Sequence, residues 1–396
     1  MPEKLDRGAK WLQHGTKGIQ LGECRIKKFE GLSYSSLSLT PRLLAKGFFG
    51  SIEVSGNYWE YAMSPSKKKA RIRDEVLARL AMQETASLMN KAIELTLDRD
   101  AKAAQERVLK HFDQTRADVQ GNPLLDKYSK ELVQVMVKLM RDADLNINFR
   151  AQEFFASSKS DSKYMTKFEK HRQAGAPMGD TRNEVEMKMF RYGERVGVDS
   201  STATTGEKAA GARLASFAVS TSPKFAGVIR PRYCSVNFPS VIDGMGAQWG
   251  RSHFVLADHL KPNMTFIHTD SFDDVSSKYD PIAKTKNTAE HVQSTKMANY
   301  HHMQRLIVNM SNNLFELLMD TSLGDTAPRE KCAIIKKKYN LSPTSYVEGH
   351  IHAELHFRRD IKKIRICNTE KNGGQKVAEN IRNFATKYNI QVEYFD

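Results

Sequence analysis

The stretch SYVEGHIHAELHF, residues 345–357, decides how the second half of this chain is expected to fold. Polar and apolar residues alternate along it, which is typical of a half-buried β-strand because successive side chains point to opposite faces of a sheet. The polar face of this strand would carry Glu348, His350, His352, Glu354 and His356. The pattern leaves three interpretations open: a metal site, a catalytic face, and an exposed face or interface.

The length of this polar row bears on the metal interpretation. Its residues would span about 27 Å at about 3.3 Å per residue, so they cannot all bind one ion. At most two neighbouring histidines could share a metal, with further ligands from elsewhere. We therefore rank a metal site below the other two interpretations and predict no bound metal.

Length and charge set the broad class of the protein. The chain has 396 residues, which favours two domains, and 40% of them are hydrophobic, as in globular proteins. The formal net charge is +15. A basic surface favours acidic partners such as nucleic acid, an anionic membrane, an acidic protein or a phosphate-bearing ligand. The alternative is that dispersed lysines only keep the protein soluble.

Cysteine usage and hydropathy indicate the compartment. The four cysteines are far apart and show no CxxC spacing, which argues against a disulfide framework or a cysteine-based zinc site and favours a reducing compartment. The first residues, MPEKLDRGAKW, lack the apolar core of a signal peptide, and no apolar run predicts a transmembrane segment. We expect a bacterial cytoplasmic protein, or an effector secreted into a host cell without a cleaved signal peptide.

The hydrophobic periodicity along the chain predicts an α+β fold, with a helical N-terminal half followed by a mixed, largely antiparallel β-sheet domain with flanking helices. We expect a β-rich N-terminal segment at 1–65, a mainly helical domain at 66–197, a flexible linker or lid at 198–212, and an α+β catalytic domain at 213–396. Within these, LNINF (145–149) is predicted to be a strand and 289–319 a long helix.

The common fingerprints of nucleotide-binding proteins and hydrolases are missing from the sequence: GxxxxGK[ST], a strand-linked GxGxxG, HExxH and GxSxG. Instead, IRPRYCSVNF places Arg230 and Arg232 two residues apart, so that on a strand both guanidinium groups would face one way and suit a phosphate or pyrophosphate. The alternative is a pair of solvated arginines on an edge strand, which Pro231 favours.

A second polar region is GRSHFVLADHLKPNMTFIHTDSF, residues 250–272. Its hydroxyl residues Ser252, Thr265 and Ser271 could hydrogen-bond the amide or ribose of a ligand. The alternative for the acidic residues at 270–274 is ordinary turn chemistry.

Taken in order, RPRY, WGRSHFVL, MTFIHTDSF and YVEGHIHAEL followed by RRDIKKI resemble a poorly characterised bacterial family. Its members show R-P-x-Y-G, G-S-x-H-F-V-L, T-F-x-x-x-D-S and Y-x-E-x-Q-x-H-G elements. The resemblance covers residues 230–364, roughly a third of the chain. The matching positions are Arg230, Tyr233, Gly250, Ser252, His253, Thr265, Asp270, Ser271, Tyr346, Glu348, His352 and Asp360.

The order of an arginine, a Ser/Thr element and a glutamate-bearing strand is also similar to that of the mono-ADP-ribosyltransferase toxins. This resemblance implies NAD as the substrate and Glu348 as the catalytic carboxylate, with His352 supporting it. It further implies pyrophosphate binding by Arg230 and Arg232, a nicotinamide–ribose pocket lined by Ser252, Thr265 and Ser271, and stacking by Tyr233 or Tyr346.

The leading hypothesis is therefore an NAD-dependent ADP-ribosyltransferase-like enzyme, an effector that modifies a host protein. One alternative is a non-enzymatic basic binding module for nucleic acid or an acidic protein. Another is a metallohydrolase that uses His350, His352 and His356.

Overall fold

The computed structural model describes most of the second half of the chain and part of the first. Its described residues are 96–115, 124–166, 169–170, 189–190, 230–271, 296–326, 329–371 and 374–396, with scattered positions from 83 to 94. The predicted β-rich segment at 1–65 and the predicted linker or lid at 198–212 lie outside them.

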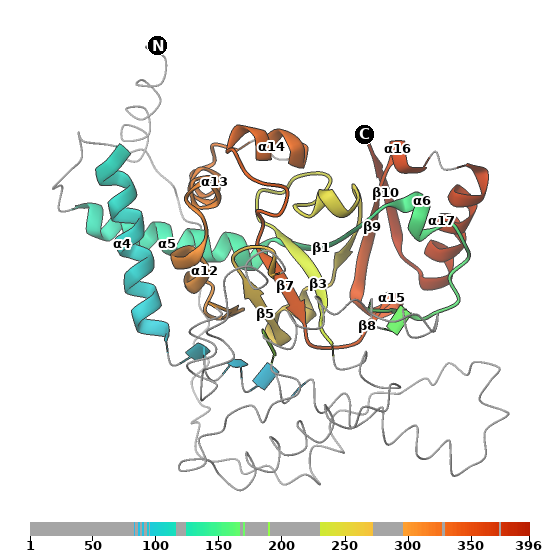
Figure 1. The fold of residues 1–396 in the computed structure, drawn as a ribbon, viewed down its shortest axis with the longest axis horizontal. Helices are drawn as coiled ribbons and strands as arrows, with labels where there is room; N and C mark the ends of the chain where they lie inside the picture. Colours follow the sequence, from blue (N-terminus) through green and yellow to red (C-terminus); the bar gives the residue numbers. More distant parts are fainter. Residues whose placement is uncertain are drawn as a thin grey trace, which may run out of the picture. The chain divides into compact units, whose positions relative to one another are not determined.

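An eight-stranded sheet forms the centre of the described fold (Figure 1). Its strands follow the order β10-β9-β4-β1-β3-β7-β5-β6, and every neighbouring pair is antiparallel except β9 and β10. The strands are β1 Asp144–Phe149, β3 Arg232–Asn237, β4 Ser252–Leu256, β5 Met264–Ile267, β6 Ala298–Asn299, β7 Glu348–Ile351, β9 Ile361–Cys367 and β10 Gln391–Phe395. A separate two-stranded sheet pairs β2 (Lys163–Tyr164) with β8 (Leu355–His356).

Two groups of helices flank this sheet (Figure 1). Helices α4, α5, α12 and α13 gather near β5 and β6, and α6, α16 and α17 gather near β9 and β10. Their bounds are α4 Leu97–Thr115, α5 Leu124–Asp142, α6 Ala151–Phe154, α12 Gln304–Asn309, α13 Asn312–Leu323, α16 Asn368–Lys371 and α17 Gln375–Tyr388. Two further helices are α14 Cys332–Lys338 and α15 Phe357–Asp360. The predicted α+β class, with helices before a mixed, mostly antiparallel sheet, is confirmed. None of these described helices is long and apolar enough to cross a membrane.

One face of the sheet is apolar. Leu145, Val236, Phe254 and Ile364 share this face and belong to the main hydrophobic core. Phe254 packs against Phe384 of α17 with ring centroids 6.1 Å apart. The alternating pattern of the strands thus places their apolar side chains under the helices.

The opposite face of the sheet is polar. Cross-strand register sets two adjacent rows of polar side chains on it: Asn146, Ser235 and Glu348, and beside them Tyr233, His350 and Thr265. All six side chains are buried or half-buried. Of the interpretations left open for the polar residues of β7, the exposed face is therefore wrong, because alternation reports which face a residue occupies and not whether that face is covered.

The strand predicted across residues 345–357 is also shorter than expected. Only Glu348–Ile351 forms β7, after which the chain bends and Leu355–His356 joins the small sheet as β8. The polar residues of the quoted stretch are therefore divided between two sheets. His356 lies opposite Lys163 of β2 and away from the row that holds His350.

The predicted long helix at 289–319 is wrong within the described residues. Residues 298–299 form β6, and α12 and α13 are separate helices. Met310 is extended, and the Ser311 side chain accepts a hydrogen bond from Leu314 N, which starts a new helix at that point. The apolar residues of 289–319 keep helical spacing across Ser311, so the sequence pattern did not reveal this N-cap.

Strand β1 comes from the predicted helical domain at 66–197 but pairs with strands of the predicted α+β domain at 213–396. It precedes the expected linker at 198–212, yet it pairs with β3 and β4, which follow that linker. Residues 144–149, predicted as a strand, thus belong to the same sheet as the C-terminal half.

Candidate functional site

The sheet forks between β1 and β3. These strands pair at three positions, ending at Asn146 and Ser235. Beyond that point residues 147–149 of β1 pair with β4, whereas residues 232–234 of β3 pair with β7. The fork opens a cavity of about 640 Å³ that is lined by residues from both arms, a size typical of small-molecule sites.

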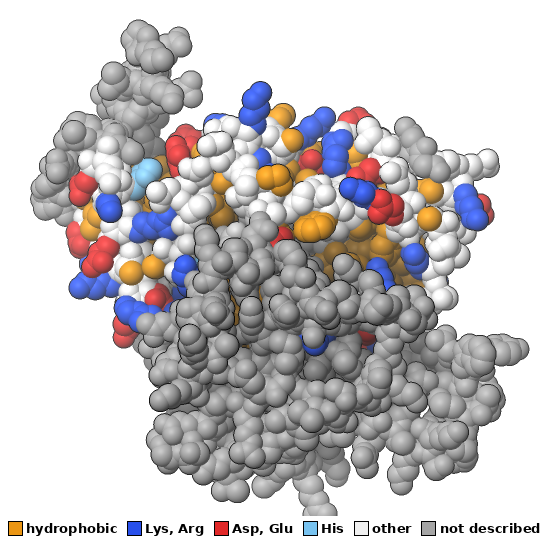
Figure 2. Space-filling model, in the orientation of Figure 1, with side chains coloured by type: hydrophobic (Ala, Val, Ile, Leu, Met, Phe, Trp, Pro, Cys, Tyr) orange, Lys and Arg blue, Asp and Glu red, His pale blue; other side chains and the backbone are white. Residues whose placement is uncertain are grey.

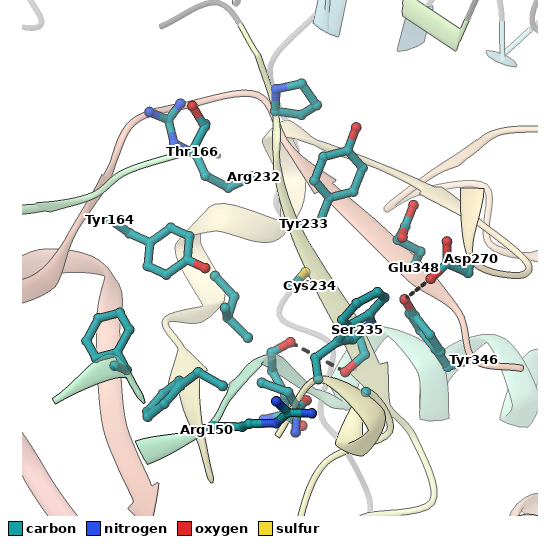
Figure 3. Close-up of a pocket in the computed structure, with 18 of the residues that line it drawn as sticks. Arg150, Tyr164, Thr166, Arg232, Tyr233, Cys234, Ser235, Asp270, Tyr346 and Glu348 are labelled. Carbon is teal, nitrogen blue, oxygen red and sulfur yellow. Dashed lines mark hydrogen bonds between the residues drawn. The ribbon is translucent and has the colours of Figure 1, made fainter. Parts of the chain in front are cut away.

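One wall of the cavity carries carboxylates and tyrosines (Figure 3). Glu348 Oε1 accepts hydrogen bonds from Ser271 N at 3.3 Å and from His350 Nε2 at 3.0 Å. Tyr346 Oη donates to Asp270 Oδ2 at 2.7 Å. Burial, together with Glu348 and Asp270, raises the pKa of the Tyr346 hydroxyl, so this group stays a hydrogen-bond donor.

The other wall is basic and aromatic. Lys159 Nζ lies 5.0 Å from the centre of the Phe154 ring, and Lys170 Nζ lies 5.9 Å from that ring and 5.5 Å from the Tyr164 ring. Neither ammonium forms an ion pair within the described residues. Burial lowers the pKa of both lysines, and the charge of Lys159 lowers that of Lys170 further. An anion bound between them would relieve this repulsion.

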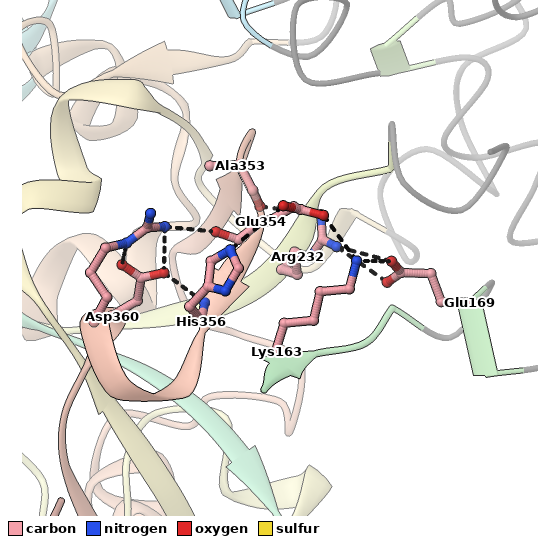
Figure 4. A network of polar contacts seen from close by, with 8 residues as sticks. Lys163, Glu169, Arg232, Ala353, Glu354, His356 and Asp360 are labelled. Carbon is pink, nitrogen blue, oxygen red and sulfur yellow. Dashed lines mark hydrogen bonds and ion pairs between the residues drawn. The ribbon is translucent and has the colours of Figure 1, made fainter. Parts of the chain in front are cut away.

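The two arginines predicted to bind phosphate lie differently. Arg232 lines the cavity, but its Nη2 is 3.2 Å from Glu169 Oε2, and its Nη1 donates to Ala353 O (Figure 4). Lys163 Nζ adds a second cation, 2.9 Å from Glu354 Oε1 and 3.7 Å from Glu169 Oε1. In this network the cations Arg232 and Lys163 lie beside the carboxylates Glu169 and Glu354. Arg230 is buried and is not among the residues that line the cavity.

The predicted hydroxyl residues surround the site without lining it. Ser252 Oγ accepts from Cys367 N at 3.0 Å, on the far side of β4. Ser271 meets Glu348 through its backbone N–H. Thr265 Oγ1 contacts the imidazoles of His350 at 3.1 Å and His352 at 2.9 Å.

The structure thus gathers only part of the predicted set in one cavity. Arg232, Tyr233, Tyr346 and Glu348 line it. The predicted residues outside the lining are Arg230, Ser252, Thr265, Ser271 and His352.

His350 of β7 and His352, which directly follows β7, face protein groups instead of a common point. Both ring nitrogens of His350 are hydrogen-bonded, to Thr265 and to Glu348, and His352 Nε2 is bonded to Thr265. Burial lowers the pKa of His352 to about 3, with a further contribution from His350. Among the described residues no group of three or more His, Cys, Asp or Glu side chains is arranged to hold a metal ion. The metallohydrolase alternative gains no support from this geometry.

Sequence reasoning missed the basic wall. Lys159 and Lys170 lie within residues 66–197, which the sequence assigned only to a mainly helical domain. A signal was present, because lysines there alternate with the aromatic residues Phe154 and Tyr164, a composition that suits anionic, ring-bearing ligands. Residues 157–170 lack periodicity, so their relation to the sheet could not be inferred.

The basic charge forms no single tract on the face of the molecule shown in Figure 2. There the Lys and Arg side chains of the described residues are scattered among Asp and Glu. Compared with known proteins, the chain matches no protein-family model, and no curated protein matches it either.

Proposed function

We propose that this chain cleaves the N-glycosidic bond of NAD and transfers ADP-ribose, with Glu348 as the catalytic carboxylate. The observation that carries the proposal is the forked cavity. It sets a buried carboxylate on one wall and two lysines on the other, and Glu348 and Tyr164 lie on opposite sides of it (Figure 3).

The two walls match two parts of the ligand, its pyrophosphate and its nicotinamide ring. The pyrophosphate of NAD is anionic and suits Lys159 and Lys170. The nicotinamide ring is cationic until its bond to ribose breaks, so it suits a wall that holds Glu348 and Asp270. Tyr233 offers an aromatic ring on that same wall.

The chemistry needs positioning and charge stabilisation more than a strong acid. As the bond between the ribose carbon and the nicotinamide nitrogen breaks, the bonding electrons leave with nicotinamide and positive charge grows on the ribose. The Glu348 carboxylate stabilises this charge. A nucleophile from an acceptor protein, or water, then bonds to the ribose carbon and gives up its proton to the carboxylate.

The test is release of nicotinamide and transfer of label from NAD carrying a tag on its adenylate half. We expect Glu348→Gln to lower both rates by about 10²–10³-fold. The matched control is Glu393→Gln, which removes a carboxylate paired with Lys363 and Arg365 at the far edge of the sheet. Absence of NAD cleavage by the wild-type protein, or equal rates in the Glu348→Gln protein, would contradict the proposal.

A further inference from the structure

Four buried side chains form a continuous hydrogen-bonded row that ends at Glu348. His352 Nε2 lies 2.9 Å from Thr265 Oγ1, which lies 3.1 Å from His350 Nδ1. His350 Nε2 in turn lies 3.0 Å from Glu348 Oε1. The exposed fraction is at most 4% for each of the four residues.

With a neutral His350 ring, the hydrogen count fixes the direction of this row. A hydroxyl carries one hydrogen, so Thr265 donates to one imidazole and accepts from the other. His350 Nε2 donates a hydrogen to a carboxylate oxygen, and in the neutral form of this ring Nδ1 is then an acceptor. Thr265 then donates to His350 and accepts from His352 Nε2–H. The low pKa of His352, caused by its burial, keeps that ring neutral and consistent with this role.

The surroundings hold the two rings in place. The Phe190 ring packs edge-on against His350 and His352, with centroids 5.1 Å and 5.4 Å away. The Tyr233 ring packs against His350 from the cavity side at 5.5 Å. Rotation of either imidazole would break both a ring contact and a hydrogen bond.

We infer that Thr265 is a positioning residue, which fixes His350 in the Nε2–H tautomer and thereby holds the carboxylate of Glu348 in its orientation toward the cavity. The inference rests on the proposed function in that Glu348 is taken as the catalytic group. His350 and the backbone N–H of Ser271 both donate to the same oxygen, Oε1, so together they set the rotation of the carboxylate.

The first measurement is the tautomer of His350, read by NMR on protein with ¹⁵N-labelled histidine. A His350→Gln variant assigns the signal. We expect the Nε2–H form in the wild-type protein, loss of that fixed form in Thr265→Val, and its return in Thr265→Ser, which keeps the hydroxyl. An Nδ1–H tautomer or a doubly protonated His350 ring in the wild-type protein would overturn the inference even if Thr265→Val failed to fold.

The second measurement is NAD cleavage. Because displacement of a catalytic group by about 1 Å can cost about a hundredfold, we expect Thr265→Val to lower kcat by about that factor with little change in KM, and Thr265→Ser to recover most of it. An unchanged kcat in Thr265→Val would contradict the positioning role. The tautomer measurement needs no NAD, so a wild-type protein that leaves NAD intact would defeat the proposed function while the NMR result still decides the row.

Discussion

Arg232 and Glu169 form an ion pair with 3.2 Å between Nη2 and Oε2, and the Arg232 side chain is completely buried. This arginine stands in the sequence element that first suggested a phosphate site. Its guanidinium instead pairs with a carboxylate inside the protein, where it connects the β3 arm of the fork to Glu169 and to the bend after β7. We assign it a structural role at the edge of the cavity.

Glu169→Gln should therefore destabilise the protein by about 3–5 kcal/mol, because it removes a carboxylate that pairs with a buried guanidinium. Urea unfolding followed by fluorescence measures this loss. Glu153→Gln is the control, since Glu153 pairs with Arg150 where both side chains are more than half exposed, and such pairs contribute about 0–1 kcal/mol. Equal losses in the two variants would show that Arg232 does not depend on Glu169.

The basic wall of the cavity predicts how ligand binding depends on charge. Lys159→Ala combined with Lys170→Ala should weaken binding of ADP-ribose at least about tenfold, because each lysine supplies a charge-assisted contact to phosphate. Isothermal titration calorimetry at low and high salt measures the affinity and its salt dependence, which should flatten in this variant.

The control for that experiment is a second double variant, which loses the same two positive charges at another place. Lys130→Ala combined with Lys138→Ala removes two exposed lysines from α5, which do not line the cavity. If both double variants bind ADP-ribose equally, the phosphates do not lie on the basic wall.

At position 250, beside the fork, there is no room for a side chain larger than that of glycine. A Cβ there would lie 2.0 Å from the Phe149 carbonyl carbon, and the φ of +136° is unfavourable for other residues. The next two backbone N–H groups, at Arg251 and Ser252, donate to Glu370 and would shift with it. Gly250→Ala should cost about 3 kcal/mol or more.

A second glycine gives the comparison for this loss. Gly324 has a φ of +82° at the end of α13, but a Cβ there would meet nothing within 4 Å. Gly324→Ala should cost only about 1 kcal/mol, because it changes backbone preference alone. Thermal melts that rank the two variants the other way would refute the close approach of residue 250 to β1.

The strands with strong local patterns could be predicted from the sequence, and the fork could not. LNINF alternates in polarity, and it lies in a strand of the sheet as predicted. The cavity depends on where β1 stops pairing with β3, a register between segments about 90 residues apart. No local pattern encodes that choice. The sequence element around Glu348 was likewise recognisable. The contact between His350 of that element and Thr265, however, arises from pairing between β5 and β7.

The positions of Lys159 and Lys170 in the cavity wall could not be predicted from the sequence either. Residues 157–170 contain no amphipathic period, and the sequence assigned them only to the expected mainly helical domain at 66–197. Their contacts with Phe154 and Tyr164 bring Lys159 and Lys170 to the cavity wall. Side chains that act through tertiary contacts can be assigned only when the fold is known.

Buried histidines predict the response of the protein to acid. Burial lowers the pKa of His253 to about 4 and that of His352 to about 3, whereas both titrate near 6.5 in an unfolded chain. Between those values the unfolded chain binds more protons than the folded protein. The free energy of unfolding therefore falls as the pH drops below about 6.5, by about 1.4 kcal/mol per pH unit for each histidine.

Replacing one of these histidines should flatten that response. From pH 7 to pH 5 we expect His253→Gln to lose about 2 kcal/mol less stability than the wild-type protein, because the titrating group is gone. Urea unfolding at the two pH values gives the difference, and the imidazole signals of His253 in the folded protein should stay unshifted over that range. A variant whose stability falls as steeply as that of the wild-type protein would show that His253 is not buried as a neutral ring beside Phe395.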